Sequence, residues 1–275
     1  MDGNSASPIL SVRNLSKHFG GIRAVDNVSL DVTPHSITGL IGPNGAGKTT
    51  LFNVISGFYK PDAGEVYYKG ERIDGLSLHQ TFRKGICRTF QISRELKLMT
   101  VLENLMLVPL AQPGESLWKT WLLPKQVSER ENEIRERALE ALRSVGLYGL
   151  RDEYAGNLSG GQKRLLELAR TMMARAELVL FDEPGAGVNP SERRTLADHI
   201  RRLVSETGAT VFLIGHEMEL VMEVCNPIIV MDRGKKLMEG SPQEVSSDPR
   251  VLEIYLKGSG DPYTVSGEAW WLGPR

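Results

Sequence analysis

A glycine-rich segment followed by lysine and threonine is the sequence feature that most limits how this chain can fold. It reads Gly42-Pro43-Asn44-Gly45-Ala46-Gly47-Lys48-Thr49 and matches the phosphate-loop pattern G-x-x-x-x-G-K-[ST]. An apolar run precedes it at 37–41, and a helical pattern follows at 49–57, so we expect a strand, a tight loop and a helix. Glycines let successive backbone N–H groups turn inward around a phosphate, and the helix N-terminus adds a positive dipole end.

This loop supplies candidate ligands for a nucleotide and its metal ion. Lys48 is expected to reach the β- and γ-phosphates, and Thr49 to offer its hydroxyl to a Mg²⁺ ion that bridges them. The loop residues predicted to contact the nucleotide are Gly42, Pro43, Asn44, Gly45, Ala46, Gly47, Lys48, Thr49 and Thr50.

Two adjacent acids follow a second apolar run, Leu-Val-Leu-Phe at 178–181. Open α/β sheets bind their ligands at the carboxyl ends of their strands. We therefore expect Asp182 to hold Mg²⁺ through water. Glu183 is placed to accept a proton from the water that attacks the γ-phosphate.

The apolar pattern predicts an α/β fold with a β-rich start and an inserted helical part. Segments 10–15 and 25–32 are predicted as strands before the phosphate loop. From 99 to 145 the pattern is mostly helical, and Ser128 with Glu131 forms an S-x-x-E capping box that predicts a helix start.

The α/β pattern then resumes. Apolar runs at 178–181 and 210–214 flank a helix that Asn189 and Pro190 would begin as N-cap and first residue. A strand, a helix and a second strand in this order predict parallel pairing of the two strands.

Composition excludes several classes of protein. The 275 residues carry 33 Lys+Arg and 34 Asp+Glu, a net charge of −1, which leaves no positive excess for non-specific nucleic-acid binding. Cys87 and Cys225 lack the paired spacing of a zinc site or disulfide framework. We find no signal peptide and no apolar window long enough to span a membrane, so any membrane role is expected to be peripheral.

A second candidate anion site precedes another helix. Leu158-Ser159-Gly160-Gly161-Gln162 leads into apolar residues at helical spacing, so Ser159 and the glycines are expected at a helix N-terminus. Because one chain already has a phosphate loop, this second site is most economically explained as completing the nucleotide site of a second subunit.

In order and spacing these motifs resemble the ATP-binding-cassette family over nearly all of residues 8–257. Gly42 to Thr49 resembles the Walker A loop, Leu178 to Asp182 the Walker B strand, and Leu158 to Gln162 the LSGGQ signature. The resemblance implies a P-loop NTPase core with an N-terminal antiparallel β-subdomain and a helical subdomain inserted at about 92–170. It also implies ATP and Mg²⁺ as cofactors and Glu183 as the catalytic glutamate.

Three further residues take their predicted roles from the resemblance alone. Gln91, in Thr-Phe-Gln, looks like the glutamine that senses Mg²⁺ and the attacking water. His216 looks like the switch histidine that contacts the γ-phosphate. Phe19 looks like the aromatic residue that stacks on adenine, with burial in the β-subdomain as the alternative.

Two positions depart from the family pattern. Asn189 stands where family members often carry Asp, so it can hydrogen-bond but has no charge. Gly215 stands before the histidine, where a larger and often acidic residue is common, and it adds local backbone freedom.

The resemblance implies that two cassettes, identical or paralogous, close head to tail over two MgATP. One chain would supply Lys48, Asp182 and Glu183 to a site that Ser159 and Gly161 of the other chain complete. The γ-phosphate would join the two halves and hydrolysis would release them.

A single cassette without a membrane span suggests a separate ATPase subunit that docks on membrane permeases. Segments such as Arg88-Thr89-Phe90-Gln91 and Glu183 to Pro190 resemble the ATP-binding subunits of high-affinity branched-chain amino acid importers. The subunit would lie in the cytoplasm on the inner membrane face, with a substrate-binding protein as an indirect partner. A subunit for urea, amides or lipopolysaccharide, and a soluble cassette ATPase acting on nucleic acid or ribosomes, are the alternatives.

Two segments keep open interpretations. Residues 92–98 are predicted either to contact a cytoplasmic helix of a permease or to pack in the core. Residues 258–275 read as a loosely held extension, in which Trp270 and Trp271 either pack on the domain or mark a contact.

Overall fold

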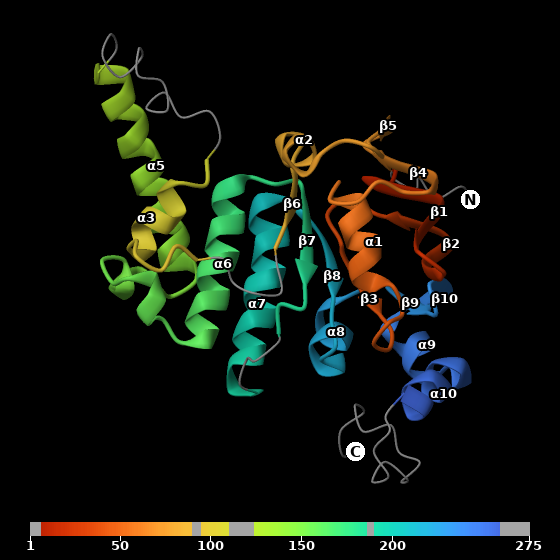
Figure 1. Cartoon of the computed structure of the whole chain (residues 1–275). Helices are drawn as coiled ribbons and strands as arrows, with labels where there is room; N and C mark the ends of the chain where they lie inside the picture. Colours follow the sequence, from red (N-terminus) through yellow and green to blue (C-terminus); the bar gives the residue numbers. More distant parts are fainter. Residues whose placement is uncertain (1–6, 90–94, 110–123, 186–189, 259–275) are drawn as a thin grey trace, which may run out of the picture.

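A six-stranded sheet forms the centre of the molecule (Figure 1). The computed structural model describes residues 7–89, 95–109, 124–185 and 190–258. The strand order is β10-β9-β3-β8-β7-β6, and all neighbours pair in parallel except β10, which is antiparallel to β9. The strands are β3 (Ile37–Ile41), β6 (Ile86–Arg88), β7 (Leu178–Asp182), β8 (Thr210–Ile214), β9 (Ile228–Asp232) and β10 (Lys235–Gly240). The predicted parallel pairing of β7 with β8 is confirmed.

A second, antiparallel sheet has the order β2-β1-β4-β5. Its strands are β1 (Leu10–Phe19), β2 (Ile22–Val32), β4 (Ala63–Tyr68) and β5 (Glu71–Arg72). The alternating apolar residues of β2, Val28, Leu30 and Val32, are buried, because one face of this sheet covers the core and the other faces solvent. The N-terminal antiparallel β-subdomain is therefore present.

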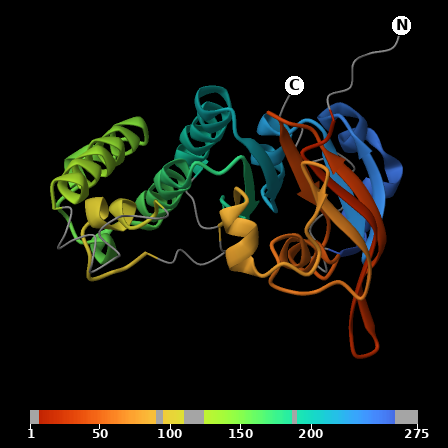
Figure 2. The same cartoon turned by 90° about the horizontal axis from the view of Figure 1, so that it is seen from above.

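Helices cover both faces of the six-stranded sheet. The helices of the described residues are α1 (Lys48–Ile55), α2 (Leu78–Arg83), α3 (Val101–Met106), α5 (Pro124–Ser144), α6 (Gly160–Ala174), α7 (Pro190–Thr207), α8 (Met218–Val224), α9 (Pro242–Ser247) and α10 (Pro249–Gly258), and of these α3 and α5 pack on α6. Two short 3₁₀ turns, at Tyr148–Leu150 and Ala155–Asn157, lie between α5 and α6. Figure 2 shows α3 and α5 at the opposite end of the molecule from β1 and β2.

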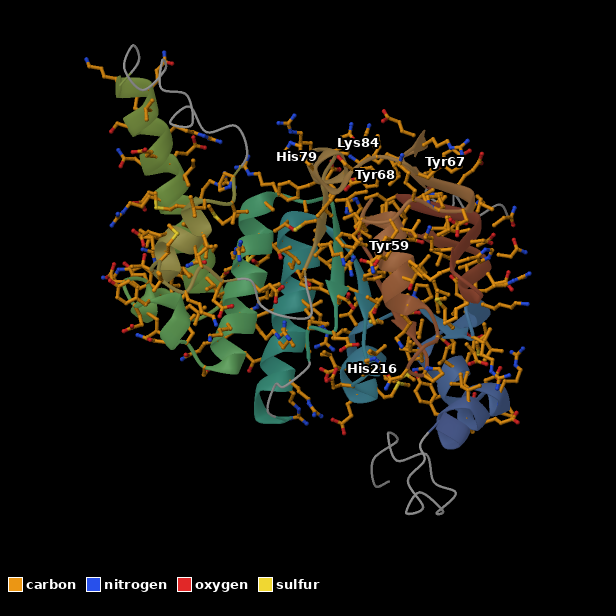
Figure 3. All side chains as sticks on the ribbon, viewed as in Figure 1. Tyr59, Tyr67, Tyr68, His79, Lys84 and His216 are labelled. Atoms are coloured by element: carbon orange, nitrogen blue, oxygen red, sulfur yellow. The ribbon has the colours of Figure 1, made fainter. Side chains whose placement is uncertain are left out.

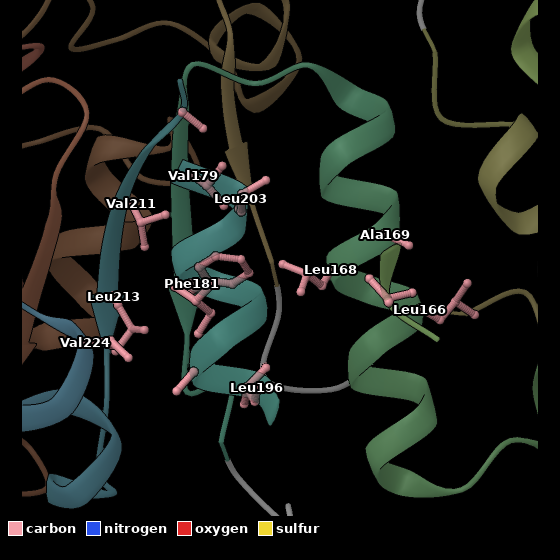
Figure 4. Packing of buried hydrophobic residues seen from close by; sticks show 14 of the residues in the cluster. Leu166, Leu168, Ala169, Val179, Phe181, Leu196, Leu203, Val211, Leu213 and Val224 are labelled. Carbon is pink, nitrogen blue, oxygen red and sulfur yellow. The ribbon is translucent and has the colours of Figure 1, made fainter. Parts of the chain in front are cut away.

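Alternate residues of the central strands enter two different cores. Val179 and Phe181 of β7 pack with α6 and α7 (Figure 4), whereas Leu178 and Leu180 pack with α1 and the antiparallel sheet. This is the two-residue period of a strand buried on both faces. It places α1 and α6 on opposite faces of the same sheet.

The start of α5 differs from the sequence prediction. The helix begins at Pro124, so Ser128 lies inside it and does not cap it. Proline is favoured in the first turn because that turn has no use for its missing N–H, and the helical pattern continues upstream of Ser128. The predicted start of α7 at Pro190 is confirmed, while Asn189 lies outside the described residues.

The α/β fold class with its β-subdomain and helical part is confirmed. No helix among the described residues is long and apolar enough to cross a bilayer. The domain bounds 8–257 and about 92–170 stay predictions. The extension from 259 on, with Trp270 and Trp271, lies outside the described part of the chain.

Candidate nucleotide site

Three neighbouring parallel strands bring the predicted site residues to one edge of the sheet. β3 ends at Ile41 before the phosphate loop, β7 ends at Asp182, and β8 ends at Ile214, two residues before His216. Figure 3 shows His216 beside the start of α8. Because parallel strands end at the same edge, residues more than 170 positions apart in the chain share one site.

The phosphate loop is held by close backbone contacts with distant strands. Gly47 has φ +98, and a Cβ there would lie 2.0 Å from the Ala24 carbonyl oxygen. A Cβ on Gly42 would lie 2.1 Å from the Met231 carbonyl oxygen. Both positions therefore require glycine for space as well as for turning. Gly47 caps α1 without a side-chain hydrogen bond, and the first turn of α1 has no acid, so this end suits an anion.

Lys48 is buried under this loop and is 5% exposed. Its Nζ donates to the carbonyl oxygens of Gly42, at 2.7 Å, and Pro43, at 3.0 Å. Burial lowers the pKa of Lys48, while the carboxylates of Glu183 and Asp182 act in the opposite direction. The lysine thus lies close to both acids and to the loop that is predicted to hold the phosphates.

Changing Lys48 to alanine is expected to weaken nucleotide binding about ten- to a hundredfold, the range for losing charge-assisted hydrogen bonds. Titration with a fluorescent ATP analogue measures this loss. Lys60→Ala, at an exposed lysine just beyond α1, is the matched control and should bind normally. Equal affinities for the two variants would contradict a phosphate-binding role for Lys48.

Asp182 and Glu183 occupy different environments. Asp182 is 2% exposed, and burial raises its pKa while the Arg88 guanidinium, 2.8 Å away, opposes that rise. Within the described residues its Oδ1 is buried without a hydrogen-bond partner. The exposed Thr49 lies at the start of α1, so hydroxyl and carboxylate oxygens are available for a metal.

This set of oxygens fits Mg²⁺, which is usually bound by one or two carboxylates together with substrate phosphates. The described residues contain no group of three or more His, Cys, Asp or Glu side chains that could hold a metal by itself. An unpartnered buried carboxylate oxygen and a separate hydroxyl are therefore consistent with an ion that arrives with the nucleotide.

Glu183 adopts a left-handed backbone conformation with φ +54. Its N–H donates to the Ile214 carbonyl oxygen at 2.9 Å, and its Oε1 lies 2.8 Å from Nε2 of His216. Such a conformation is costly for a residue other than glycine and recurs at active sites. The structure therefore joins the predicted proton acceptor to the predicted switch histidine.

Gly215 has a packing reason to lack a side chain. A Cβ there would lie 2.2 Å from Cγ2 of Val221, in the first turns of α8. The glycine thus lets α8 approach the end of β8 closely, next to His216.

Phe19 lies at the end of the β1–β2 hairpin and is 41% exposed, so its side chain is available to a ligand. Its ring meets the ring of Tyr59 edge-on, with centroids 5.2 Å apart, and Nζ of Lys17 lies 5.6 Å from the Phe19 centroid. This half-exposed position favours the predicted adenine contact over burial in the β-subdomain.

Ser159 caps α6 through a complete capping box. Its Oγ accepts from the Gln162 N–H at 3.2 Å, and the Gln162 side chain accepts from the Ser159 N–H at 2.9 Å. Ser159 and Gly160 are exposed, and Gly161 is partly buried. The apolar residues of α6 and those of α1 pack on opposite faces of the sheet, so the two helix N-termini belong to different layers of the chain.

Sequence reasoning missed the partners of Asp182 and of Gly42. Arg88, at the end of β6, contacts Asp182 and Asn53, and the Gly42 backbone hydrogen-bonds the Tyr255 hydroxyl of α10. A signal existed for Arg88, since an arginine in a short apolar strand must be paired if it is buried. Gln91, predicted to sense Mg²⁺, lies outside the described residues.

Comparison with known proteins identifies the class. A family model described as "ABC transporter" matches residues 25–186, more than half of the chain, and one described as "Branched-chain amino acid ATP-binding cassette transporter" matches 235–256. The chain therefore belongs to the ATP-binding cassette (ABC) transporter family. As in that family, it is an ATP-binding and ATP-hydrolysing subunit, which confirms the predicted enzyme class.

Curated relatives match over most of their length. LivG of Escherichia coli K12, a high-affinity branched-chain amino acid transport ATP-binding protein, is 39% identical, covering 91% of this chain and 98% of LivG. BraF of Pseudomonas aeruginosa, with the same description, is 41% identical, covering 90% of this chain and 98% of BraF. The predicted resemblance to this subfamily is confirmed.

Solved structures agree. A nucleotide-free ATP-binding cassette from an ABC transporter superposes with a TM-score of 0.78 at 38% identity and covers 90% of this chain and 98% of that chain. The ADP conformation of MJ1267, an ATP-binding cassette of an ABC transporter, superposes with a TM-score of 0.78 at 37% identity. It covers 91% of this chain and 99% of that chain.

Proposed function

We propose that this chain powers an importer of branched-chain or related amino acids. The observation that carries this proposal is the 39–41% identity to branched-chain amino acid transport ATP-binding proteins over nine-tenths of the chain. The match at 235–256 to the branched-chain cassette family adds support from the C-terminal part of the chain.

The site residues are proposed to hydrolyse ATP as follows. Lys48 exchanges the Gly42 and Pro43 carbonyls for the β- and γ-phosphate oxygens. Thr49 and, through water, Asp182 would hold Mg²⁺, which would supply positive charge against the phosphates. Glu183, oriented by His216, accepts a proton from the attacking water, and Phe19 stacks on adenine.

Each site is proposed to be shared between two cassettes, identical or paralogous. The exposed end of α6, with Ser159 and Gly161, lies on the other face of the sheet from α1 and is free to meet a second chain. The γ-phosphate then joins two chains that ADP leaves apart, and this differential contact drives the switch.

The segment after Gln91 is proposed to contact a permease. Leu96 is 45% exposed and Leu98 is 92% exposed, which argues against core packing. The buried Asn104 holds the backbone of this loop: its Oδ1 accepts from the Leu96 N–H at 2.9 Å, and its Nδ2 donates to the Leu96 and Thr100 carbonyl oxygens. A loop that presents apolar side chains on a fixed backbone suits a protein partner. If that partner is a permease, this chain would lie on the inner membrane face.

The proposal is tested in cells that carry this gene. Deletion is expected to abolish uptake of radiolabelled leucine, isoleucine and valine, and the wild-type chain, but not a Glu183→Gln variant, to restore it. Affinity purification of the chain from detergent-solubilised membranes should retain permease subunits. Normal uptake after deletion, or recovery with ribosomes in place of permeases, would overturn the proposal.

A further inference from the structure

Arg88 joins three elements beneath the nucleotide site. It lies at the end of β6, opposite Leu180 of β7 in the parallel register, and its Nη2 donates to Oδ2 of Asp182 at 2.8 Å. Its Nη1 donates to Oδ1 of Asn53, at 2.6 Å, and to Oγ of Ser56, at 3.3 Å, at the far end of α1. The guanidinium therefore connects the helix that follows the phosphate loop to the strand that ends at Asp182.

This ion pair is almost fully removed from water. The side chain of Arg88 is 6% exposed and that of Asp182 is 2% exposed. A carboxylate buried to this degree requires a charged or hydrogen-bonding partner, because desolvation strongly disfavours an unpaired charge. Arginine suits the position because its fork of donors can bind one carboxylate oxygen and the Asn53 amide oxygen at the same time.

The two carboxylate oxygens of Asp182 differ in their hydrogen bonding. Oδ2 is held by Arg88, whereas Oδ1 is buried without a partner in the part of the chain that the structure describes. The backbone beside the acid is also tied to β6: the Thr89 N–H donates to the Leu180 carbonyl oxygen at 3.0 Å, and the Asp182 N–H points to the Thr89 hydroxyl at 3.5 Å. Rotation of the carboxylate would break its contact with Arg88.

We propose that Arg88 is a positioning residue for the magnesium site: by holding Oδ2 of Asp182 it leaves Oδ1 as the one oxygen that accepts a hydrogen bond from metal-bound water. This inference rests on the proposed Mg²⁺-dependent function. Asn53 supports this positioning role, because its side chain in α1 holds the guanidinium of Arg88. Partners that orient a metal ligand in this way typically change metal affinity 10- to 100-fold when they are altered.

The alternative is that Arg88 only fastens β6 and α1 to β7. A fastening residue would weaken binding of metal-free and metal-bound nucleotide alike. A positioning residue would change the requirement for Mg²⁺ and leave metal-free binding in place. The ratio of nucleotide affinity with Mg²⁺ to nucleotide affinity without Mg²⁺ separates these roles.

The test uses the purified full-length chain and a fluorescent ATP analogue, titrated first in EDTA and then with increasing Mg²⁺. Arg88→Lys keeps the charge and removes the fork. We expect its affinity in EDTA to stay within about twofold of wild type, and the Mg²⁺ concentration for half-maximal enhancement to rise about tenfold or more. Arg72→Lys is the matched control, because the exposed Arg72 also pairs with an aspartate, Asp74, but in the β-subdomain.

Asn53→Ala is the second variant and decides the question if Arg88→Lys fails to fold, as judged by circular dichroism and melting. It leaves the Arg88–Asp182 pair in place and should raise the Mg²⁺ requirement about threefold, at the low end of the range for losing one hydrogen bond, because Asn53 acts on Asp182 only through Arg88. An unchanged Mg²⁺ requirement, or an equal loss with and without Mg²⁺, overturns the inference. If Mg²⁺ does not strengthen binding to the wild-type chain, it is the proposed function that fails.

Discussion

Replacing Glu183 with glutamine is expected to slow ATP hydrolysis by about 100-fold or more, the lower range for removing a general base. Affinity for ATP should stay within about threefold of wild type, because the amide has the shape of the carboxylate and can still bond the His216 ring. Phosphate release measures the first effect, and titration with a fluorescent nucleotide measures the second.

The substitution isolates chemistry from structure. The strained backbone at Glu183, with φ +54, is equally costly for glutamate and glutamine, so the exchange adds no conformational penalty. The N–H bond to the Ile214 carbonyl also remains. Glu177→Gln is the control, since Glu177 lies at the opposite end of β7 and pairs with Lys69 at the surface. Hydrolysis at the wild-type rate in the Glu183 variant would remove Glu183 from the catalytic role.

Local sequence patterns were enough to predict several elements of the fold. The phosphate loop predicted a strand before it and a helix after it, and β3 and α1 lie there. Alternating apolar residues predicted β2, because each strand residue faces either the core or solvent. Both signals depend on residues within about ten positions of one another, which is the range at which sequence patterns act directly.

Contacts between distant segments could not be predicted in this way. Arg88 and Asp182 are 94 positions apart, and only the order of strands in the sheet brings them together. The pair Glu183 and His216 was likewise predicted as two separate roles and lies within 2.8 Å. The need for glycine at Gly42 also depends on a carbonyl of β9, which no local pattern shows.

Replacing Ser159 with arginine is expected to abolish ATP-dependent pairing of two chains while leaving nucleotide binding to one chain intact. Ser159 is exposed at the N-terminus of α6, across the sheet from the phosphate loop, so its change does not reach the nucleotide site of its own chain. In a head-to-tail pair it would place a bulky side chain where the γ-phosphate of the partner is held. Size-exclusion chromatography with light scattering, on the hydrolysis-deficient Glu183→Gln background with ATP, measures the pairing.

Loss of the helix cap alone must be separated from this effect, because removing an N-cap serine costs about 1 kcal/mol of stability. Ser77→Arg provides that separation: Ser77 caps α2 through the same kind of capping box, with Gln80 in the place of Gln162. Both arginine variants lose one cap, but only the change at Ser159 alters the proposed contact surface. We therefore expect the Ser77 variant to pair with ATP and the Ser159 variant to stay monomeric. If the Ser159 variant pairs as the Ser77 variant does, each chain must complete its nucleotide site without the signature segment of another.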